Sequence, residues 1–509
     1  MRNFSALILL VSALTAFAQT KKAPGDTVTV AAEHSDIGVV EEKSAPAAHT
    51  AHPDAQWYPD AGLGLFIHWG IASVRAMNIS WPMIPGRALA TKHIDDPAER
   101  ERIIREGDYD LRGKPNAITP NEYFSMAGDF RPEPPRYDPD KWIAAAKAAG
   151  FQYVVLTTRH HEGFALWPSA YGDFDTKNFM GGRDLLKSYV EACRKYGLKV
   201  GFYYSPPDWY FDRDFKNFIY GRGAKNNPEI PPVGPDLKPR TTMHTPEEIA
   251  AHRAAYVAKV NGQVEELLTR YGKIDLLWFD GRPEVPDTSG CISQERIRAL
   301  QPGIVINPRL HGHGDFVTFE RTLPKERPAN LGWAEFCNTW TNSWSHQEIP
   351  FRANAFVLGE LAQSRAWGIN YLLGVGPTKD GEMCAGVYEN MAVVADWMKR
   401  NAPSVAPGAK PLPKTEIASV YATARGAARF LFAVPAFKNG GKMPQDQLPP
   451  RDETLTLRGV ASPKSVTLLA GGDTLNFIYD AATRTVSVSL PAAQRTKLVD
   501  VVAIELPPG

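Results

Sequence analysis

Asp280 is the residue whose position points most directly to chemistry. It follows residues 274–279, Ile-Asp-Leu-Leu-Trp-Phe, a short and nearly continuous apolar run without Pro or Gly. Such a run is typical of a strand buried on both faces of a parallel sheet. In α/β barrels the loops at the carboxyl ends of the strands build the active site. Asp280 is therefore a candidate catalytic carboxylate, the alternative being an Asp that caps the next turn.

Polar and aromatic side chains also stand at the ends of other apolar runs. With Asp280, the candidates are His68, His160, His161, Tyr203, Trp278, Arg309 and Glu320. Two carboxylates, imidazoles and aromatic faces, without a phosphate-binding glycine loop, favour hydrolysis of a sugar. In glycosidases one carboxylate attacks or activates water and the other protonates the leaving oxygen. Aromatic rings pack on apolar sugar faces, and we expect the histidines to donate to hydroxyl groups.

Two of these candidates have a structural alternative. Arg309 is either an ion-pair partner with no role in the reaction or a fixed cation that lowers the pKa of a nearby carboxylate. Trp278 is either a core residue or a pocket residue. Because Trp278 stands two places before Asp280, both side chains lie on the same face of the strand, which favours the pocket.

The adjacent pair His160 and His161 raises the question of a metal ion. Neighbours in a strand point to opposite faces, so both can bind one ion only where the strand has already turned into a loop. A barrel metalloenzyme would more naturally show His-x-His with further ligands at other strand ends. We therefore predict no metal at this pair.

The order of elements predicts an α/β fold. A helix opened by Asp138 and Pro139 precedes a strand at residues 151–158, and a second helical pattern from residue 185 precedes a strand at residues 200–205. Thr245 begins a third helix in a capping-box pattern, and that helix leads to the strand before Asp280. Alternation of this kind indicates a parallel sheet and a (β/α)8-like TIM barrel.

The two ends of the chain lack the alternating helix and strand pattern of the barrel. Arg2, the apolar residues 4–17 and an Ala-Phe-Ala at residues 16–18 predict a signal peptide over residues 1–18, so that the protein is exported to the periplasm or the medium. Residues 19–53 lack apolar periodicity and are expected to be a flexible leader without a chemical role. Residues 54–403 form the predicted barrel, and period-two patterns over residues 404–509 predict a C-terminal β-sandwich.

Composition narrows the classes of partner. The 509 residues carry 57 Lys and Arg against 56 Asp and Glu, a balance that offers no electrostatic case for nucleic acid or an anionic membrane. No stretch is long and apolar enough to span a bilayer. Four cysteines without CxxC spacing suggest neither a zinc site nor a disulfide scaffold, and leave open one or two bridges.

Several motifs, in this order, resemble glycoside hydrolase family 29, the α-L-fucosidases. The resemblance covers about residues 57–400 and rests on Gly-Leu-Phe-Ile-His-Trp-Gly at 64–70, Thr-Thr-Arg-His-His-Glu-Gly-Phe at 157–164, Gly-Phe-Tyr-Tyr-Ser at 201–205, Leu-Trp-Phe-Asp-Gly at 277–281, and Tyr-Leu-Leu-Gly-Val-Gly-Pro at 371–377. It implies a barrel followed by a β-sandwich, no cofactor, and a fucosylated glycan as substrate.

The resemblance also implies roles for individual residues. Asp280 matches the nucleophile of a retaining mechanism, and Glu320, about a dozen residues after Arg309, holds the place of the acid/base. The residues matching those that hold the sugar are His68, Trp81, His160, His161, Tyr203 and Trp278. Because the acid/base loop varies in the family, Glu335 is the runner-up for that role.

One departure from the family bears on selectivity. Many relatives carry Glu-Trp in the loop after the first strand, where this chain has Ser80 and Trp81, so a carboxylate that usually binds a sugar hydroxyl is replaced by a hydroxyl group. The prediction is an exported retaining α-L-fucosidase. The alternatives are a glycosidase for a related sugar such as α-L-galactose, and a catalytically silent glycan-binding barrel.

Overall fold

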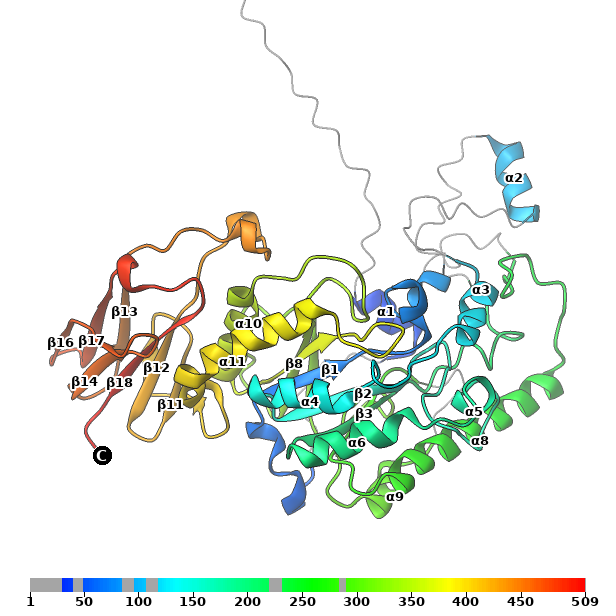
Figure 1. Ribbon diagram of the computed structural model, residues 1–509, viewed down its shortest axis with the longest axis horizontal. Coiled ribbons are helices and arrows are strands. Elements are labelled where there is room, and N and C mark those ends of the chain that lie inside the picture. The colour runs from blue at the N-terminus through cyan, green and yellow to red at the C-terminus, as the bar shows by residue number, and fades with distance from the viewer. Residues whose placement is uncertain are drawn as a thin grey trace, which may run out of the picture.

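The computed structural model describes residues 30–39, 49–84, 96–106, 118–218, 231–282 and 290–508 (Figure 1). The predicted signal peptide lies outside these residues. No helix of the described chain is long and apolar enough to cross a membrane. Cys193, Cys337 and Cys384 are free thiols.

Eight parallel strands form the central sheet, in the order β5-β4-β3-β2-β1-β8-β7-β6. They are β1 Leu63–Ile67, β2 Tyr153–Arg159, β3 Lys199–Tyr204, β4 Leu276–Phe279, β5 Val305–Ile306, β6 Val317–Glu320, β7 Ala334–Thr339 and β8 Asn370–Val375. This is the strand order of a (β/α)8 barrel. Within the described chain, no ladder joins β5 to β6, so the sheet is curled and open at that seam.

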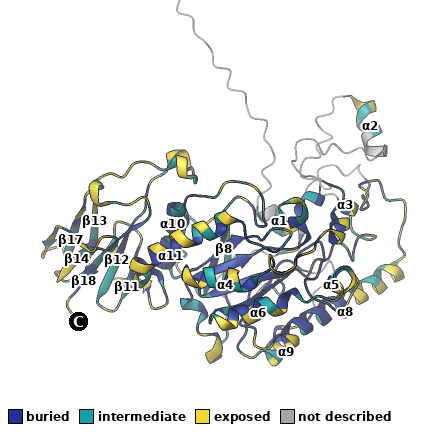
Figure 2. Cartoon of the chain, in the orientation of Figure 1, coloured by how far each residue is buried: buried dark blue, intermediate teal, exposed yellow. Residues whose placement is uncertain are grey.

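Helices cover the outside of this sheet (Figures 1 and 2). They are α3 Pro120–Ser125, α4 Pro139–Ala148, α5 Thr176–Phe179, α6 Leu185–Lys195, α8 Pro246–Arg270, α9 Gln294–Leu300, α10 Asn354–Trp367 and α11 Ala385–Val405, while α2 Pro97–Glu106 belongs to the insertion between β1 and β2. The predicted starts of α4 and α8 are observed: Asp138 accepts a hydrogen bond from Lys141 N, and Thr245 forms a capping box with Glu248. No described helix separates β5, β6 and β7, which makes this side of the barrel irregular.

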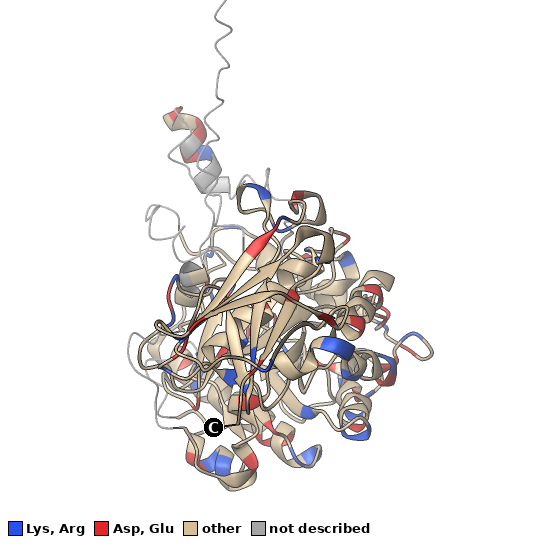
Figure 3. Cartoon of the chain, turned by 90° about the vertical axis from the view of Figure 1, so that its left-hand side faces the viewer, with Lys and Arg blue, Asp and Glu red and all other residues tan. Residues whose placement is uncertain are grey.

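Two antiparallel sheets form the C-terminal β-sandwich, in the orders β10-β13-β17-β16 and β15-β14-β18-β12-β11-β9. The strands are β9 Lys410–Pro411, β10 Ile417–Ala418, β11 Ala422–Arg425, β12 Ala428–Ala433, β13 Glu453–Arg458, β14 Ser465–Leu468, β15 Asp473–Thr474, β16 Phe477–Asp480, β17 Thr485–Leu490 and β18 Asp500–Glu505. Figure 3 views this end of the molecule, where residues of both charges are interspersed.

The sandwich is joined to the barrel through strand β12. Phe430 and Phe432 belong to the large core that continues into the barrel, whereas Leu431 and Ala433 belong to the separate core between the two sheets. This alternation follows the period of two along a strand. Trp397 of α11 adds a hydrogen bond from Nε1 to the carbonyl of Val499, 2.7 Å long. The sandwich therefore shares apolar packing with the barrel.

Residues 30–39 differ from the predicted flexible leader. Val30–Asp36 form helix α1, and the following Ile37 is only 3% exposed. The backbone N of Arg282, just after β4, donates to the Ile37 carbonyl over 2.8 Å. An apolar side chain buried on the barrel and a backbone hydrogen bond hold this short helix, although its sequence lacks an amphipathic pattern.

The shared core predicts that the two parts stabilise each other. Phe432→Ala should lower the free energy of unfolding by about 3–5 kcal/mol, because Phe432 is fully buried in the joint core. Ile478→Ala is the matched control, since Ile478 is 75% exposed and its loss should change stability by less than about 0.5 kcal/mol. Denaturant unfolding followed by tryptophan fluorescence measures both, and similar small losses in the two variants would show that the joint core contributes little.

Candidate active site

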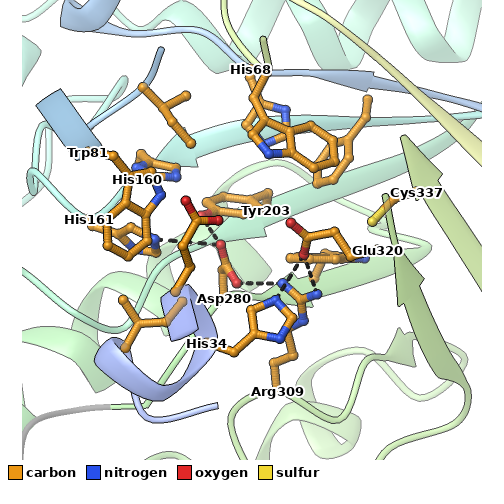
Figure 4. Close-up of a pocket in the computed structure, with 16 residues that line it drawn as sticks. His34, His68, Trp81, His160, His161, Tyr203, Asp280, Arg309, Glu320 and Cys337 are labelled. Atoms are coloured by element: carbon orange, nitrogen blue, oxygen red, sulfur yellow. Dashed lines mark hydrogen bonds and ion pairs between the residues drawn. The ribbon is translucent and has the colours of Figure 1, made fainter. Parts of the chain in front are cut away.

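A pocket lies at the carboxyl ends of the barrel strands (Figure 4). All nine predicted site residues line it: His68, Trp81, His160, His161, Tyr203, Trp278, Asp280, Arg309 and Glu320. The remaining lining residues are Glu33, His34, Ile37, Phe66, Ile79, Cys337 and Trp344. The parallel strands bring together side chains that are up to 252 positions apart in the predicted set, because every strand ends on the same side of the sheet.

Arg309 connects the two candidate catalytic carboxylates. Its two terminal nitrogens donate to Asp280 Oδ1 over 2.7 Å and to Glu320 Oε2 over 2.6 Å (Figure 4). Burial raises the pKa of Glu320, but the charge of Arg309 and the hydrogen bond to His34 outweigh it and hold that pKa well below its usual range. Both ion pairs are largely shielded from water, so the guanidinium fixes the relative positions of the carboxylates.

Tyr203 provides the second contact to Asp280. Its hydroxyl donates to Asp280 Oδ2 over 2.7 Å, so each oxygen of the carboxylate has a donor. Burial and the neighbouring carboxylate raise the pKa of Tyr203 well above its ordinary value, which keeps the phenol protonated. The ring stacks on Trp278, with centroids 5.5 Å apart, and Arg309 lies 4.5 Å from the centre of the Trp278 ring. Tyr203 and Trp278 thus form an aromatic floor that packs against the charged group of Arg309.

His161 lies between Ser205 and Asp280. Ser205 Oγ lies 2.6 Å from His161 Nδ1 and 3.1 Å from the Pro207 carbonyl. Burial lowers the pKa of His161 well below its usual value, and the ring is neutral. Its Nε2 lies 3.7 Å from Asp280 Oδ2.

His68 is also held neutral, because burial lowers its pKa well below the usual range. Among the described residues, its Nδ1 atom has no hydrogen-bond partner although the ring is only 4% exposed. A buried polar atom without a partner is costly. In a pocket of this kind it is available to a hydroxyl group of a bound molecule.

His160 and His161 meet the condition under which neighbouring side chains can share one face. Strand β2 ends at Arg159, so the pair lies in the loop that follows, and their ring centroids are 4.0 Å apart. The chain has left the strand where the alternation rule would separate them. Ligand atoms of His160, His161 and Asp280 all lie within 4.8 Å of one another, a donor set that could hold a metal ion.

Ser80 belongs to a buried network with His160 and Glu162. Its hydroxyl donates to Glu162 Oε2, and the same oxygen lies 2.6 Å from His160 Nδ1, which must therefore donate to it. Many relatives carry a carboxylate at the position of Ser80. In this chain the carboxylate of Glu162 lies beside that position. Ile79, just before Ser80, has a positive φ of 47°, a strained conformation for a β-branched residue. Ser345 holds it by accepting from Ile79 N over 2.9 Å.

A family model described as Alpha-L-fucosidase matches residues 31–403 of this sequence. The chain belongs to the alpha-L-fucosidase family. The tissue alpha-L-fucosidase of Bos taurus is 27% identical over 396 residues, 74% of this chain and 74% of that protein. The chain is therefore an α-L-fucosidase, a glycoside hydrolase.

Solved structures agree with this family. Alpha-L-fucosidase isoenzyme 1 from Paenibacillus thiaminolyticus is 27% identical, with a TM-score of 0.65, and the match covers 89% of this chain and 99% of that one. A GH29 alpha-L-fucosidase from Bacteroides thetaiotaomicron, described as a trapped covalent intermediate in complex with 2-fluoro-fucosyl fluoride, has 20% identity and a TM-score of 0.63, covering 92% and 99%. At that identity the likeness concerns the fold.

Glu335, the runner-up acid/base, lies away from the pocket lining of this fucosidase. Its carboxylate is fully buried and accepts from Trp278 Nε1 over 2.9 Å, Tyr153 over 2.7 Å and Tyr58 over 3.2 Å. Its contact with Trp278 lies beneath the aromatic floor, so Glu335 positions that ring. Burial raises the pKa of Glu335 to about 7.

The sequence analysis did not identify several residues that line the pocket of this fucosidase. Phe66 lies two positions before His68, so the period of two along a strand could have found it. Trp344 follows β7 in a loop and had no such signal. Glu33 and His34 reach the pocket from α1, far from any predicted strand end, and only the folded chain reveals them.

The position of Glu335 predicts a pH-dependent stability. Its pKa is raised on folding, so the folded state favours the protonated form, and the free energy of unfolding should fall as pH rises from about 4.5 to about 7. Glu335→Gln cannot ionise and should remove this fall. Relative to the variant, the wild type should lose about 3 kcal/mol over that interval. Glu389→Gln, on an exposed face of α11, should keep the wild-type slope. Denaturant unfolding at each pH measures this, and parallel curves for wild type and Glu335→Gln would contradict it.

Proposed function

We propose that this fucosidase hydrolyses terminal α-L-fucosyl groups of glycans with retention, by double displacement. The observation that carries the proposal is the bridge of Arg309 between Asp280 and Glu320. Retaining glycosidases keep their two carboxyl groups about 5–5.5 Å apart, whereas inverting enzymes leave about 6.5–9.5 Å for a water molecule. One guanidinium that binds both groups favours the closer arrangement.

Asp280 is the nucleophile in this mechanism. Its oxygen attacks the anomeric carbon while the bond to the leaving oxygen breaks, forming a fucosyl-enzyme ester. Arg309 and Tyr203 each donate to one of its oxygens and orient the carboxylate for attack. The covalent intermediate described for the Bacteroides thetaiotaomicron relative supports this step.

Glu320 is the acid and then the base. In the first step it gives a proton to the leaving oxygen, and in the second it takes a proton from the water that attacks the ester. Asp280 is released, and the product has the configuration of the substrate. Glu320 reaches the pocket from the end of β6, beside Arg309.

The sugar is held by the histidines and the aromatic rings. His160 and His161 each have Nδ1 2.6 Å from a serine hydroxyl, which leaves Nε2 for a hydrogen bond with a sugar hydroxyl. Trp278, Trp81 and Tyr203 supply ring faces for the apolar side of the pyranose.

Fucose is proposed over L-galactose because the pocket carries apolar rings where a methyl group can pack. L-Galactose bears a hydroxymethyl group in place of that methyl. An apolar pocket rejects an added hydroxyl only about 10²-fold. The values of kcat/KM for the 4-nitrophenyl α-L-fucoside and α-L-galactoside decide between the two sugars, and a preference for the galactoside would favour the second.

Export is proposed on the N-terminal residues, with Arg2 before an apolar segment and Ala16 and Ala18 framing a cleavage site. N-terminal sequencing of protein from the periplasm or medium of a bacterial host should begin at Gln19. An intact Met1 on protein found only in the cell interior would argue against export.

Variants of the two carboxylates should separate their roles. Asp280→Ala should lower kcat/KM by at least about 10³-fold on every fucoside, because no bond to the anomeric carbon can form. Glu320→Ala should lower it about 10²–10⁴-fold on natural glycans, whose leaving groups need a proton, and far less on 4-nitrophenyl fucoside. Asp396→Asn, an exposed residue of α11, is the control and should change neither value.

Proton NMR of the first product tests the stereochemistry. Retention requires α-L-fucose to appear before mutarotation, and initial release of β-L-fucose would overturn the mechanism. Equal losses on both classes of substrate in Glu320→Ala would remove Glu320 as the acid. Absence of turnover on every fucoside by folded wild-type protein would leave the catalytically silent glycan-binding barrel.

A further inference from the structure

Helix α1 lies over the pocket on the side of Glu320 (Figure 4). His34 Nε2 is 3.0 Å from Glu320 Oε2, the same oxygen that accepts from Arg309. Ile37, just after the helix, is buried against the pocket and held by the backbone N of Arg282. Three residues of this segment therefore line the site, since Glu33 also does.

The space that remains is small. The cavity left for water-sized molecules is about 30 Å³, where one water needs about 10–15 Å³ by the same measure. Such a cavity does not hold a sugar together with the group to which the sugar is attached. With α1 in this position, the larger part of a fucosylated glycan has no room.

The contact of His34 identifies which part of the substrate is excluded. An acid that protonates the leaving oxygen must lie against that oxygen. His34 is bonded to the carboxylate oxygen of Glu320 and so occupies space beside it, where a leaving group has to pass. The side chains of His34 and Glu320 are 12% and 9% exposed, so they shield each other from water.

The hydrogen bonds that Glu320 accepts from His34 and Arg309 also indicate that α1 moves before the reaction. An acid must carry a proton at the start of the reaction, yet Arg309 and His34 hold the pKa of Glu320 below its usual range despite burial. Moving α1 away would remove one of these two donors and open the oxygen to a leaving group.

Helix α1 depends on the barrel for its position. It has 7 residues, fewer than the about 12–15 that an isolated helix needs in water. Contacts with the barrel therefore hold it, among them those of His34, Ile37 and the backbone beside Arg282.

We propose that α1 covers the active site beside Glu320 and must move aside before a fucoside binds. The proposal rests on the role of Glu320 in the proposed function. Fucosides with a small leaving group require the movement as well, because the remaining cavity of about 30 Å³ has no room for the sugar ring.

A reversible cross-link tests the proposal on the full chain. A Cβ placed at Gly38 would lie 3.4 Å from Cβ of Arg282, close to the about 3.5–4.5 Å of a disulfide. The variant Gly38→Cys with Arg282→Cys should therefore lock α1 in place when oxidised and release it when reduced with dithiothreitol. Because Gly38 has a φ of 70°, which strains any side chain placed there, the control is Gly38→Ala with Arg282→Cys, which carries the same strain but cannot form the bridge.

The effect of the cross-link is measured with two substrates. In the oxidised double variant, kcat/KM should fall at least about tenfold on both a fucosylated oligosaccharide and α-L-fucosyl fluoride, because the sugar ring itself has no room beneath the locked helix. Reduction should restore both values. Unchanged turnover of either substrate by the cross-linked protein overturns the proposal.

Two substitutions test the opposite direction. His34→Ala and Ile37→Ala each remove a contact that holds α1 and should lower KM for both substrates a few-fold, because the helix then covers the pocket less of the time. Ser35→Ala, an exposed position of the same helix, should leave KM unchanged. An increase in KM for both substrates in His34→Ala and Ile37→Ala would make α1 part of the substrate-binding site and overturn the proposal. Failure of the proposed function is distinct, because wild-type protein would then turn over neither substrate.

Discussion

The ion pairs of Arg309 are the interaction on which the site depends. A buried guanidinium between Asp280 and Glu320 keeps two carboxylates close together that would otherwise repel each other. Removal of one partner would leave a buried charge without compensation, which is far more costly than loss of an exposed ion pair. The barrel places Arg309 just beyond β5, beside the open seam, so the bridge joins the sheet on one side of the seam to β6 on the other.

Neutral groups surround this charged centre, and their neutrality follows from burial. His68 and His161 have lowered pKa values for this reason, while Tyr203 keeps its proton. Beneath them Glu335 holds the indole of Trp278. Each layer fixes the one above it: the Glu335 carboxylate orients the Trp278 ring, that ring stacks on Tyr203, and Tyr203 donates a hydrogen bond to Asp280. Preorganised dipoles of this kind are an effective source of catalysis because they need not rearrange during the reaction.

Segments outside the regular barrel complete the pocket. Ser80 and Trp81 follow a strained residue held by Ser345, and α1 contributes Glu33 and His34 to the lining. The barrel strands supply the catalytic groups and the loops decide what reaches them, a division common to TIM-barrel enzymes. The β-sandwich shares the core of the barrel through Phe430 and Phe432 and takes no part in the pocket lining among the described residues.

The sequence by itself determined the strands, most of their helices and the residues at the strand ends, because buried parallel strands are apolar throughout and caps such as Asp138 are local. With the family resemblance, which added Trp81, it predicted nine of the sixteen residues that line the pocket. Only the tertiary structure decided that His160 and His161 share a face, that Glu335 lies beneath Trp278, and that His34 reaches Glu320 from 286 positions away. These depend on where a strand stops and on contacts between distant segments, and no local pattern of residues encodes either.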